Sequence, residues 1–198
     1  MSPSSPLTAD AVDVATVAFG PVVSAGDRVS VPLEGAPLRI VTKKCVLANS
    51  PLDGDGNVNP FVSLKRATVT DKKFFDAFEK RVLAEAVANK TEWFGESVDA
   101  DHVASSFKSF VKDGALKVRV SADTTAFDEA GEAIDVASFF AGDEVRALLE
   151  ATAVRVGNNE FGLVWALRQI RKESKVACLI NPDPIADEEA DGDWDMFI

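Results

Sequence analysis

Two segments, EVRALLEATAVRV at residues 144–156 and EFGLVWALRQIR at residues 160–171, flank the tripeptide Gly157-Asn158-Asn159. Glycine and asparagine tolerate the positive φ angles of tight hairpin turns, and both flanking segments are long and rich in Val, Leu and Ala. In the second segment large apolar residues recur at every other position: Phe161, Leu163, Trp165 and Leu167. That period of two places them on one strand face. We therefore expect a β-hairpin that organises the second half of the fold and holds Trp165 in the core.

The region before this hairpin also has the pattern of strands. Between residues 116 and 120, Leu and Val alternate with Lys117 and Arg119, which predicts a half-buried strand with a basic outer face. The sequence DEAG at residues 128–131 predicts a turn between this strand and the hairpin. Nearer the amino terminus, short apolar runs broken by Gly and Pro indicate several more short strands.

Two helices are expected between these strand regions. Thr70 can cap a helix whose Asp71 favours the amino end. Its apolar residues then recur every four positions: Phe74, Phe78, Val82 and Ala86. A second, amphipathic helix is expected from about Asp99, ending at Lys112-Asp113-Gly114. Its apolar face would consist of Val103, Phe107, Phe110 and Val111.

These elements predict a β-rich α+β fold with a curved antiparallel sheet or small barrel. An oligonucleotide-binding (OB-fold-like) antiparallel barrel with two covering helices and disordered termini fits the pattern, although other β-rich α+β folds suit it almost as well. We expect residues 1–14 to be a disordered amino-terminal segment and residues 15–180 to form one domain. Residues 181–198 are expected to be an acidic, disordered carboxy-terminal tail.

The charge of the chain is distributed unevenly. Its formal net charge is −11, but residues 181–198 hold seven acidic residues and no Lys or Arg, while residues 39–120 hold 14 basic and 11 acidic residues, a net of +3. A polyanionic ligand is therefore not excluded for the central region. The tail ends in apolar residues within acidic surroundings, and a partner-binding role is expected for Asp193, Trp194, Asp195, Phe197 and Ile198. A solubilising terminus is the alternative.

No pattern indicates catalysis, a cofactor or a metal. The only histidine is His102, and the two cysteines Cys45 and Cys178 are far apart. Residues 53–57 have the acidic spacing that opens a calcium loop, but Val58 and Leu64 stand where such a loop has Gly and Glu. No phosphate-binding Gly-Lys-Ser loop or nucleophile elbow occurs. No long apolar run or signal peptide is present either. We expect a soluble, intracellular protein that is not an enzyme and does not contact membranes.

Three short blocks occur in a distinctive order: Glu92-Trp93-Phe94-Gly95, then Phe127-Asp128-Glu129-Ala130-Gly131-Glu132, then Phe161-Gly162-Leu163-Val164-Trp165-Ala166-Leu167-Arg168-Gln169. On these blocks, about residues 74–172 resemble the single-stranded-DNA-binding proteins of nucleocytoplasmic large DNA viruses, which include the African swine fever virus protein and relatives from algal and giant viruses. One departure is that relatives often have an aromatic residue before the hairpin turn, where this chain has residues 152–156, TAVRV.

The resemblance implies an oligonucleotide-binding barrel and binding of single-stranded DNA in viral DNA replication, recombination or repair. It also implies a location in the host's cytoplasmic viral factory or in the nucleus. The acidic tail would recruit replication proteins, and homo-oligomerisation stays open.

The candidate contact residues are inferred from physics rather than from the resemblance. Sequence-tolerant binding of a single strand needs cations along the phosphates and aromatic faces for the bases. The candidates lie in or beside expected strands, or in the Trp-Phe-Gly block: Lys43, Lys44, Lys65, Arg66, Trp93, Lys117, Arg119, Arg155 and Arg168. For Trp93 the alternative is a hydrophobic plug, and for each cation it is an ordinary surface charge.

Two other classes of function stay open. The same fold could serve as a protein-interaction module or virion component that binds no nucleic acid, because a fold does not determine a function. A nuclease or nucleotide hydrolase that uses Asp and Glu with magnesium is the weaker third alternative. Salt-dependent, sequence-indifferent binding would favour the single-strand binder over both.

Overall fold

The computed structural model describes residues 6–25, 28–35, 37–52, 56–66, 69–96, 98–157 and 160–173. The predicted acidic tail at residues 181–198 and Cys178 lie outside these ranges.

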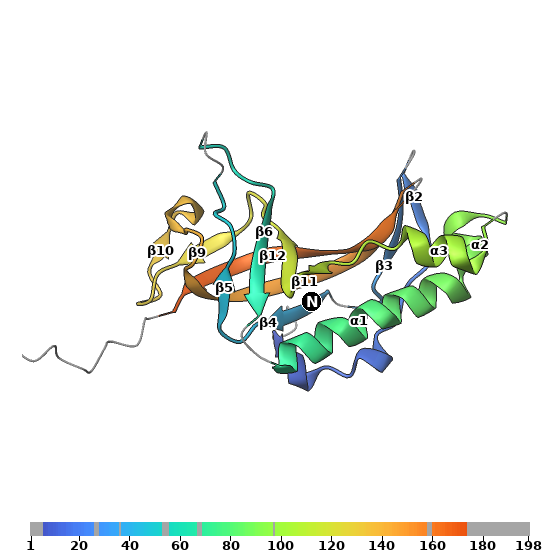
Figure 1. The fold of residues 1–198 in the computed structure, drawn as a ribbon, viewed down its shortest axis with the longest axis horizontal. Helices are drawn as coiled ribbons and strands as arrows, with labels where there is room; N and C mark the ends of the chain where they lie inside the picture. The colour runs from blue at the N-terminus through green and yellow to red at the C-terminus, as the bar shows by residue number, and fades with distance from the viewer. Residues whose placement is uncertain are drawn as a thin grey trace, which may run out of the picture.

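Figure 1 shows a long curved sheet with helices along one side. The helices are α1 (Val69–Ala88), α2 (Lys90–Phe94) and α3 (Ala100–Ser106), with short 3-10 turns η1 (Ala9–Ala11), η2 (Val14–Thr16) and η3 (Val136–Ser138). The strands are β1 (Leu7–Thr8), β2 (Val23–Ala25), β3 (Arg28–Pro32), β4 (Leu38–Val41), β5 (Cys45–Leu47), β6 (Phe61–Arg66), β7 (Val111–Lys112), β8 (Ala115–Arg119), β9 (Thr125–Phe127), β10 (Ala133–Ile134), β11 (Glu144–Val156) and β12 (Phe161–Lys172).

The strands form one sheet in the order β1-β4-β11-β5-β6-β8-β12-β9-β10, and β11 also pairs directly with β12. The pairings among β11, β5, β6, β8 and β12 therefore run in a cycle of five strands. Two links of this cycle are only two residues long, at Glu144 and Val145 on β11 and at Trp165 and Ala166 on β12. The β-rich α+β class is confirmed, while a closed oligonucleotide-binding barrel stays a prediction.

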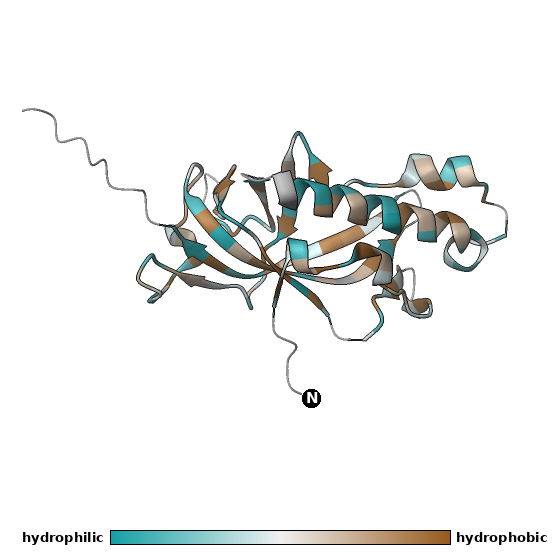
Figure 2. Cartoon of the chain, turned by 90° about the horizontal axis from the view of Figure 1, so that it is seen from below, coloured by the Kyte–Doolittle hydropathy of each residue, from teal (hydrophilic) through white to brown (hydrophobic). Residues whose placement is uncertain are grey.

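The core lies between the inner face of the sheet and α1. Trp165 of β12 is fully buried, and its ring centroid lies 5.3 Å from Phe75, 5.6 Å from Phe78 and 6.1 Å from Phe110. The core prediction for Trp165 is thus confirmed. Figure 2 shows α1 lying lengthwise over the sheet. Among the described helices, none is both long and apolar enough to span a bilayer.

The strongest sequence patterns predicted their elements correctly. Strands β11 and β12 form the expected antiparallel hairpin, and α1 contains all four residues of its expected apolar face, each of them buried. The DEAG turn is also present, because the Gly131 N–H donates to the Asp128 carbonyl and Gly131 adopts φ 91°.

The second helix was predicted too long. Helix α3 ends at Ser106, and the chain continues in extended form because Phe107 bridges to Phe161 and the Lys108 N–H donates to the Phe161 carbonyl at 2.8 Å. Residues 113–114 turn between two strands rather than ending a helix. The short helix α2 was not expected, so the described part of the chain has three α-helices instead of two.

The predicted disorder of residues 1–14 is wrong for residues 6–14. Strand β1 pairs in parallel with β4, η1 follows it, and Ala9 is buried in the core. Residues 1–5 lie outside the described ranges.

Candidate nucleic-acid interface

One row of residues crosses five strands on the face of the sheet that points away from the core. Phe61 of β6 pairs with Arg119 of β8, Arg119 with Ala166 of β12, Ala166 with Glu150 of β11, and Glu150 with Arg39 of β4. Directly paired residues project from the same face of a sheet. At about 4.8 Å between strands, this cross-strand row is ~19 Å long.

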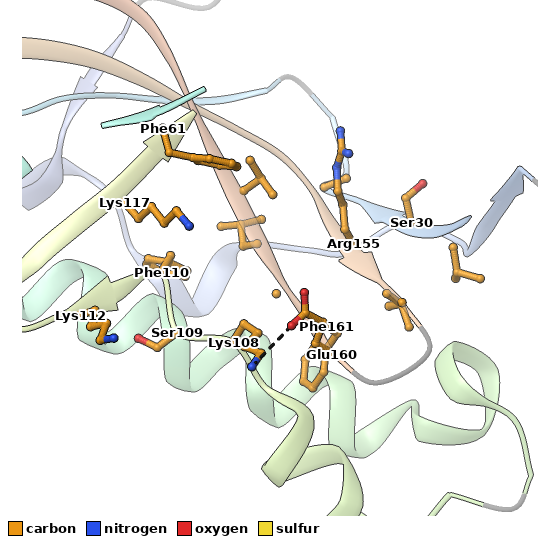
Figure 3. Close-up of a pocket in the computed structure, with 17 residues that line it drawn as sticks. Ser30, Phe61, Lys108, Ser109, Phe110, Lys112, Lys117, Arg155, Glu160 and Phe161 are labelled. Atoms are coloured by element: carbon orange, nitrogen blue, oxygen red, sulfur yellow. Dashed lines mark ion pairs between the residues drawn. The ribbon is translucent and has the colours of Figure 1, made fainter. Parts of the chain in front are cut away.

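A groove of about 810 Å³ lies at the Phe61 end of the row (Figure 3). Its floor is the start of β12 at residues 161–164. One wall is the extended segment at residues 108–112 together with Lys117, and the other wall consists of residues 29–30 of β3 and residues 153–157 at the end of β11. The groove is therefore built by the β11–β12 hairpin together with β3, β6, β8 and the segment before β8, which are distant from the hairpin in sequence.

The groove is strongly cationic. Lys108, Lys112, Lys117 and Arg155 line it and are exposed, and Glu160 is the one acidic residue among its described lining residues. These groups sum to +3 in a chain whose net charge is −11. Glu160 lies 3.5 Å from the Lys108 ammonium, but both side chains are about two-thirds exposed, so this pair is weak.

An aromatic ring lies among these cations. Phe61 is half-buried, and the Lys117 Nζ lies 4.4 Å from the centre of its ring. Figure 3 shows the two side chains next to each other at the groove. A cation over a ring face both orients the lysine and leaves an apolar surface at which a base can stack.

Gly162 explains how the wall comes so close to the floor. A Cβ atom at this position would lie 2.7 Å from the Lys108 carbonyl oxygen, closer than side-chain atoms approach backbone. The wall is also fastened to α1, because Glu79 accepts hydrogen bonds from the Ser109 hydroxyl at 2.5 Å and the Val111 N–H at 3.1 Å. The Phe-Gly-Leu-x-Trp block therefore supplies the close approach at Gly162 and the buried core at Trp165.

Several candidate cations lie on this face. Lys117 and Arg155 line the groove, and Arg119 lies next to it in the cross-strand row. Lys65 is exposed on β6, four residues after Phe61 and therefore on the same face of the strand. Arg66 ends β6, but its side chain lies outside the described part of the structure.

The two cations before β5 are placed elsewhere. Lys43 is exposed in the link between β4 and β5, and Lys44 lies 2.5 Å from the Glu144 carboxylate. Neither residue lines the groove. Arg168 is on the groove side of β12 but donates to Glu150 from Nε at 3.0 Å and from Nη2 at 2.6 Å.

Trp93 is not available for stacking in this structure. It is buried in α2, with its ring 6.0 Å from Phe19 and 6.4 Å from Phe94. The stacking prediction for Trp93 is therefore wrong, and the alternative of a hydrophobic plug describes its surroundings.

Sequence reasoning missed Phe61, Lys108 and Lys112, which line the groove. Lys108 and Lys112 were assigned to a helix, and only the pairing of Phe107 with Phe161 places them at the groove. For Phe61 the sequence does contain a signal. Residues 62–65 alternate in polarity, and Val62 and Leu64 are buried, so Phe61 is an aromatic residue on the opposite, polar face of the same strand.

Three further predictions concern the acidic tail, His102 and metal binding. The tail residues Asp193, Trp194, Asp195, Phe197 and Ile198 lie outside them. His102 is exposed on α3, as expected of a surface group. Over the described ranges, no group of three or more His, Cys, Asp or Glu side chains is arranged to hold a metal ion.

The fold and groove define a β-rich α+β domain with a cationic, aromatic-lined groove on the solvent face of its sheet. Residues 62–184 match the family of unknown function DUF5871, and the chain belongs to that family. The matched range includes β8, β11 and β12, which supply much of the groove. No curated protein matches the chain significantly in sequence.

Some solved structures are distantly similar. The single-stranded DNA-binding protein from bacteriophage Enc34, solved in complex with single-stranded DNA, is 12% identical, with a TM-score of 0.48 over 79% of this chain and 96% of that chain. The single-stranded DNA-binding protein gp2.5 of bacteriophage T7 is 11% identical, with a TM-score of 0.44 over 72% of this chain and 97% of that chain. TM-scores below 0.5 establish neither the topology nor the function of this chain.

Proposed function

We propose that this protein binds single-stranded DNA, without strong sequence preference, through the cationic groove. The observation that favours this function is the placement of Lys108, Lys112, Lys117 and Arg155 around the half-buried ring of Phe61. Cations neutralise phosphates and release counterions, while each base stacked on an aromatic ring contributes about 1–3 kcal/mol. Neither interaction distinguishes one base from another.

The test is fluorescence anisotropy of a labelled 30-nucleotide oligothymidine, titrated with the full chain at two salt concentrations beside a duplex control. We expect tighter binding of the single strand, with log K falling against log salt by about 0.7 per phosphate neutralised. Lys117→Glu should weaken binding and make this slope shallower. Lys80→Glu is the matched control, because Lys80 is an exposed residue of α1 outside the groove and the change in charge is the same.

Two results would contradict the proposal. Absence of binding at low salt would leave a protein-interaction module as the better account. Equal weakening by Lys117→Glu and Lys80→Glu would mean that net charge, and not the groove, governs binding.

We further propose that the protein is a viral single-strand binder of the kind found in nucleocytoplasmic large DNA viruses, acting in DNA replication, recombination or repair. This proposal is supported by the order of the three sequence blocks.

The acidic tail would recruit replication proteins through Trp194, Phe197 and Ile198, and could compete with DNA for the groove. Deleting residues 183–198 should leave DNA affinity unchanged or stronger, and a weaker affinity would refute the competition. Phe197→Ala should leave DNA binding unaltered.

A further inference from the structure

The far end of the cross-strand row, opposite the groove, holds two arginines around one carboxylate. The Arg39 Nε donates to Glu150 Oε2 at 2.7 Å, and Arg168 donates to Glu150 Oε1 from Nε at 3.0 Å and from Nη2 at 2.6 Å. The Glu150 side chain is 3% exposed, whereas the Arg39 and Arg168 side chains are 33% and 34% exposed. The carboxylate therefore lies beneath two guanidinium groups that reach solvent.

Arg39, Arg168 and Glu150 together carry a net charge of +1, which falls to zero when the exposed Asp123 carboxylate near Arg168 is counted. Burial raises the pKa of Glu150, but the hydrogen bonds and charges of Arg168 and Arg39 outweigh it and hold the pKa below its ordinary value. Glu150 is thus ionised at neutral pH and offsets one of the two arginines. The remaining unit charge faces solvent on the same side of the sheet as the groove.

Donors remain available in the cluster. Among the described residues, the Nη atoms of Arg39 have no hydrogen-bond partner, because only its Nε contacts Glu150. The Arg168 Nη1 lies 3.9 Å from Asp123, beyond hydrogen-bond distance, and the Asp123 side chain is 84% exposed. Guanidinium groups held in a fixed orientation match the geometry of phosphate oxygens.

We propose that Arg39 and Arg168, oriented by Glu150, form a second phosphate-binding site for the same single strand. This inference rests on the proposed function of the groove. The strand would cross the β-strands along the row, from Phe61 past Arg119 to Arg39, a path of ~19 Å. That length corresponds to about six nucleotides at the 3.4 Å rise of a stacked strand. Asp123 competes with the phosphate for Arg168.

The path also explains an otherwise costly arrangement. A buried carboxylate with two arginines is often no more stabilising than apolar residues of similar size, so stability alone gives little reason for it. In the proposed site Glu150 is a positioning residue: it touches no DNA and fixes the orientation of the two guanidinium groups that do.

Oligonucleotide length separates this site from the groove. The variant Arg39→Gln keeps a polar group beside Glu150 and removes the charge. It should bind oligothymidine of four nucleotides as the wild type does, but bind 15 nucleotides about threefold to tenfold more weakly, with a salt slope shallower by about 0.7. Arg171→Gln is the matched control, since Arg171 is an exposed arginine of β12 that pairs with Glu173 and lies outside the row.

A second variant leaves the arginine cluster intact. Asp123→Asn should bind the 15-nucleotide strand about twofold more tightly, because the competing carboxylate is gone. Wild-type affinity of both Arg39→Gln and Asp123→Asn for the long strand would overturn the second site while leaving the groove in place. Absence of binding by the wild type to either oligonucleotide would overturn the proposed function itself.

Discussion

The two faces of the sheet use aromatic side chains in opposite ways. On the inner face, Trp165 is enclosed by phenylalanines of α1 and by Phe110, and none of its ring reaches solvent. On the outer face, Phe61 is half-buried and its ring is covered by the Lys117 ammonium. The conspicuous tryptophan motifs thus build the core, whereas Phe61 on the outer face belongs to no motif.

Buried ionisable groups differ in the same way. Burial of the Cys45 thiol in the core raises its pKa to about 11, since the nearby charges of Asp71 and Glu173 also favour the neutral form and the hydrogen bond to Thr42 opposes this only in part. Glu150 on the outer face is also buried, yet its pKa is lowered, because Arg168 and Arg39 donate hydrogen bonds to its carboxylate and their positive charges favour the ionised form. The two pKa shifts have opposite signs because Cys45 is surrounded by apolar and anionic groups, whereas Glu150 is hydrogen-bonded to two cations.

The largest expected effect comes from removing the central ring of the inner face. Trp165→Ala should lower the free energy of unfolding by about 3–5 kcal/mol, because a large cavity opens beside three phenylalanines. Urea denaturation followed by far-ultraviolet circular dichroism measures this loss. Phe61→Ala on the outer face is the control and should cost about 1 kcal/mol or less. Equal losses for both variants would remove the distinction between the faces.

Alkaline pH should weaken the inner face through Cys45. Between pH 9 and pH 11 the unfolded thiol loses its proton while the buried thiol keeps it, so the folded state binds more protons and the free energy of unfolding falls as pH rises. A shift from 9.0 to about 11 corresponds to about 2–3 kcal/mol. Urea denaturation at both pH values measures it. In Cys45→Ala this component should vanish; an unchanged pH slope in that variant would contradict the assignment to Cys45.

The contact between the groove wall and floor should tolerate no side chain at Gly162. Gly162→Ala would place a Cβ 2.7 Å from the Lys108 carbonyl oxygen, so the wall must move away. We expect a loss of about 1–3 kcal/mol in the free energy of unfolding, typical of added volume at a packed position. Chemical denaturation measures the loss, and faster amide hydrogen exchange at Lys108 would locate it. Wild-type stability and exchange would show that the wall can adjust freely.

The elements that the sequence predicts well are those whose pattern is local and long. In β12, burial alternates from Phe161 to Arg168, and α1 repeats its apolar residues from Phe74 to Ala86. In each case one period describes most of the element, and a single wrong position would not change the assignment.

The groove and the cross-strand row could not be predicted because they depend on contacts between distant segments. Residues 107–111 have the spacing of an amphipathic helix, but pairing of Phe107 with Phe161 keeps them extended. The cross-strand row likewise depends on four strand registers at once, and periodicity within one strand cannot determine how it aligns with its neighbours. The exposed face of Lys117 and Arg119 was predicted correctly, because the alternation within the single strand β8 is enough to determine it.

The smallest expected effect tests whether the Phe61 ring provides a stacking face rather than mere apolar surface. Phe61→Leu keeps an apolar side chain beside Lys117 but removes the aromatic plane, so affinity for oligothymidine should fall by about 1 kcal/mol, roughly fivefold, at the low end of the range for one stacked base. Phe140→Leu is the control, because Phe140 is 62% exposed and lies outside the groove. Anisotropy titration compares the two variants. The slope of log K against log salt should equal that of the wild type, since no cation is lost. A shallower slope would mean that Phe61 acts by orienting Lys117. Unchanged affinity would mean that the outer face binds through charge alone.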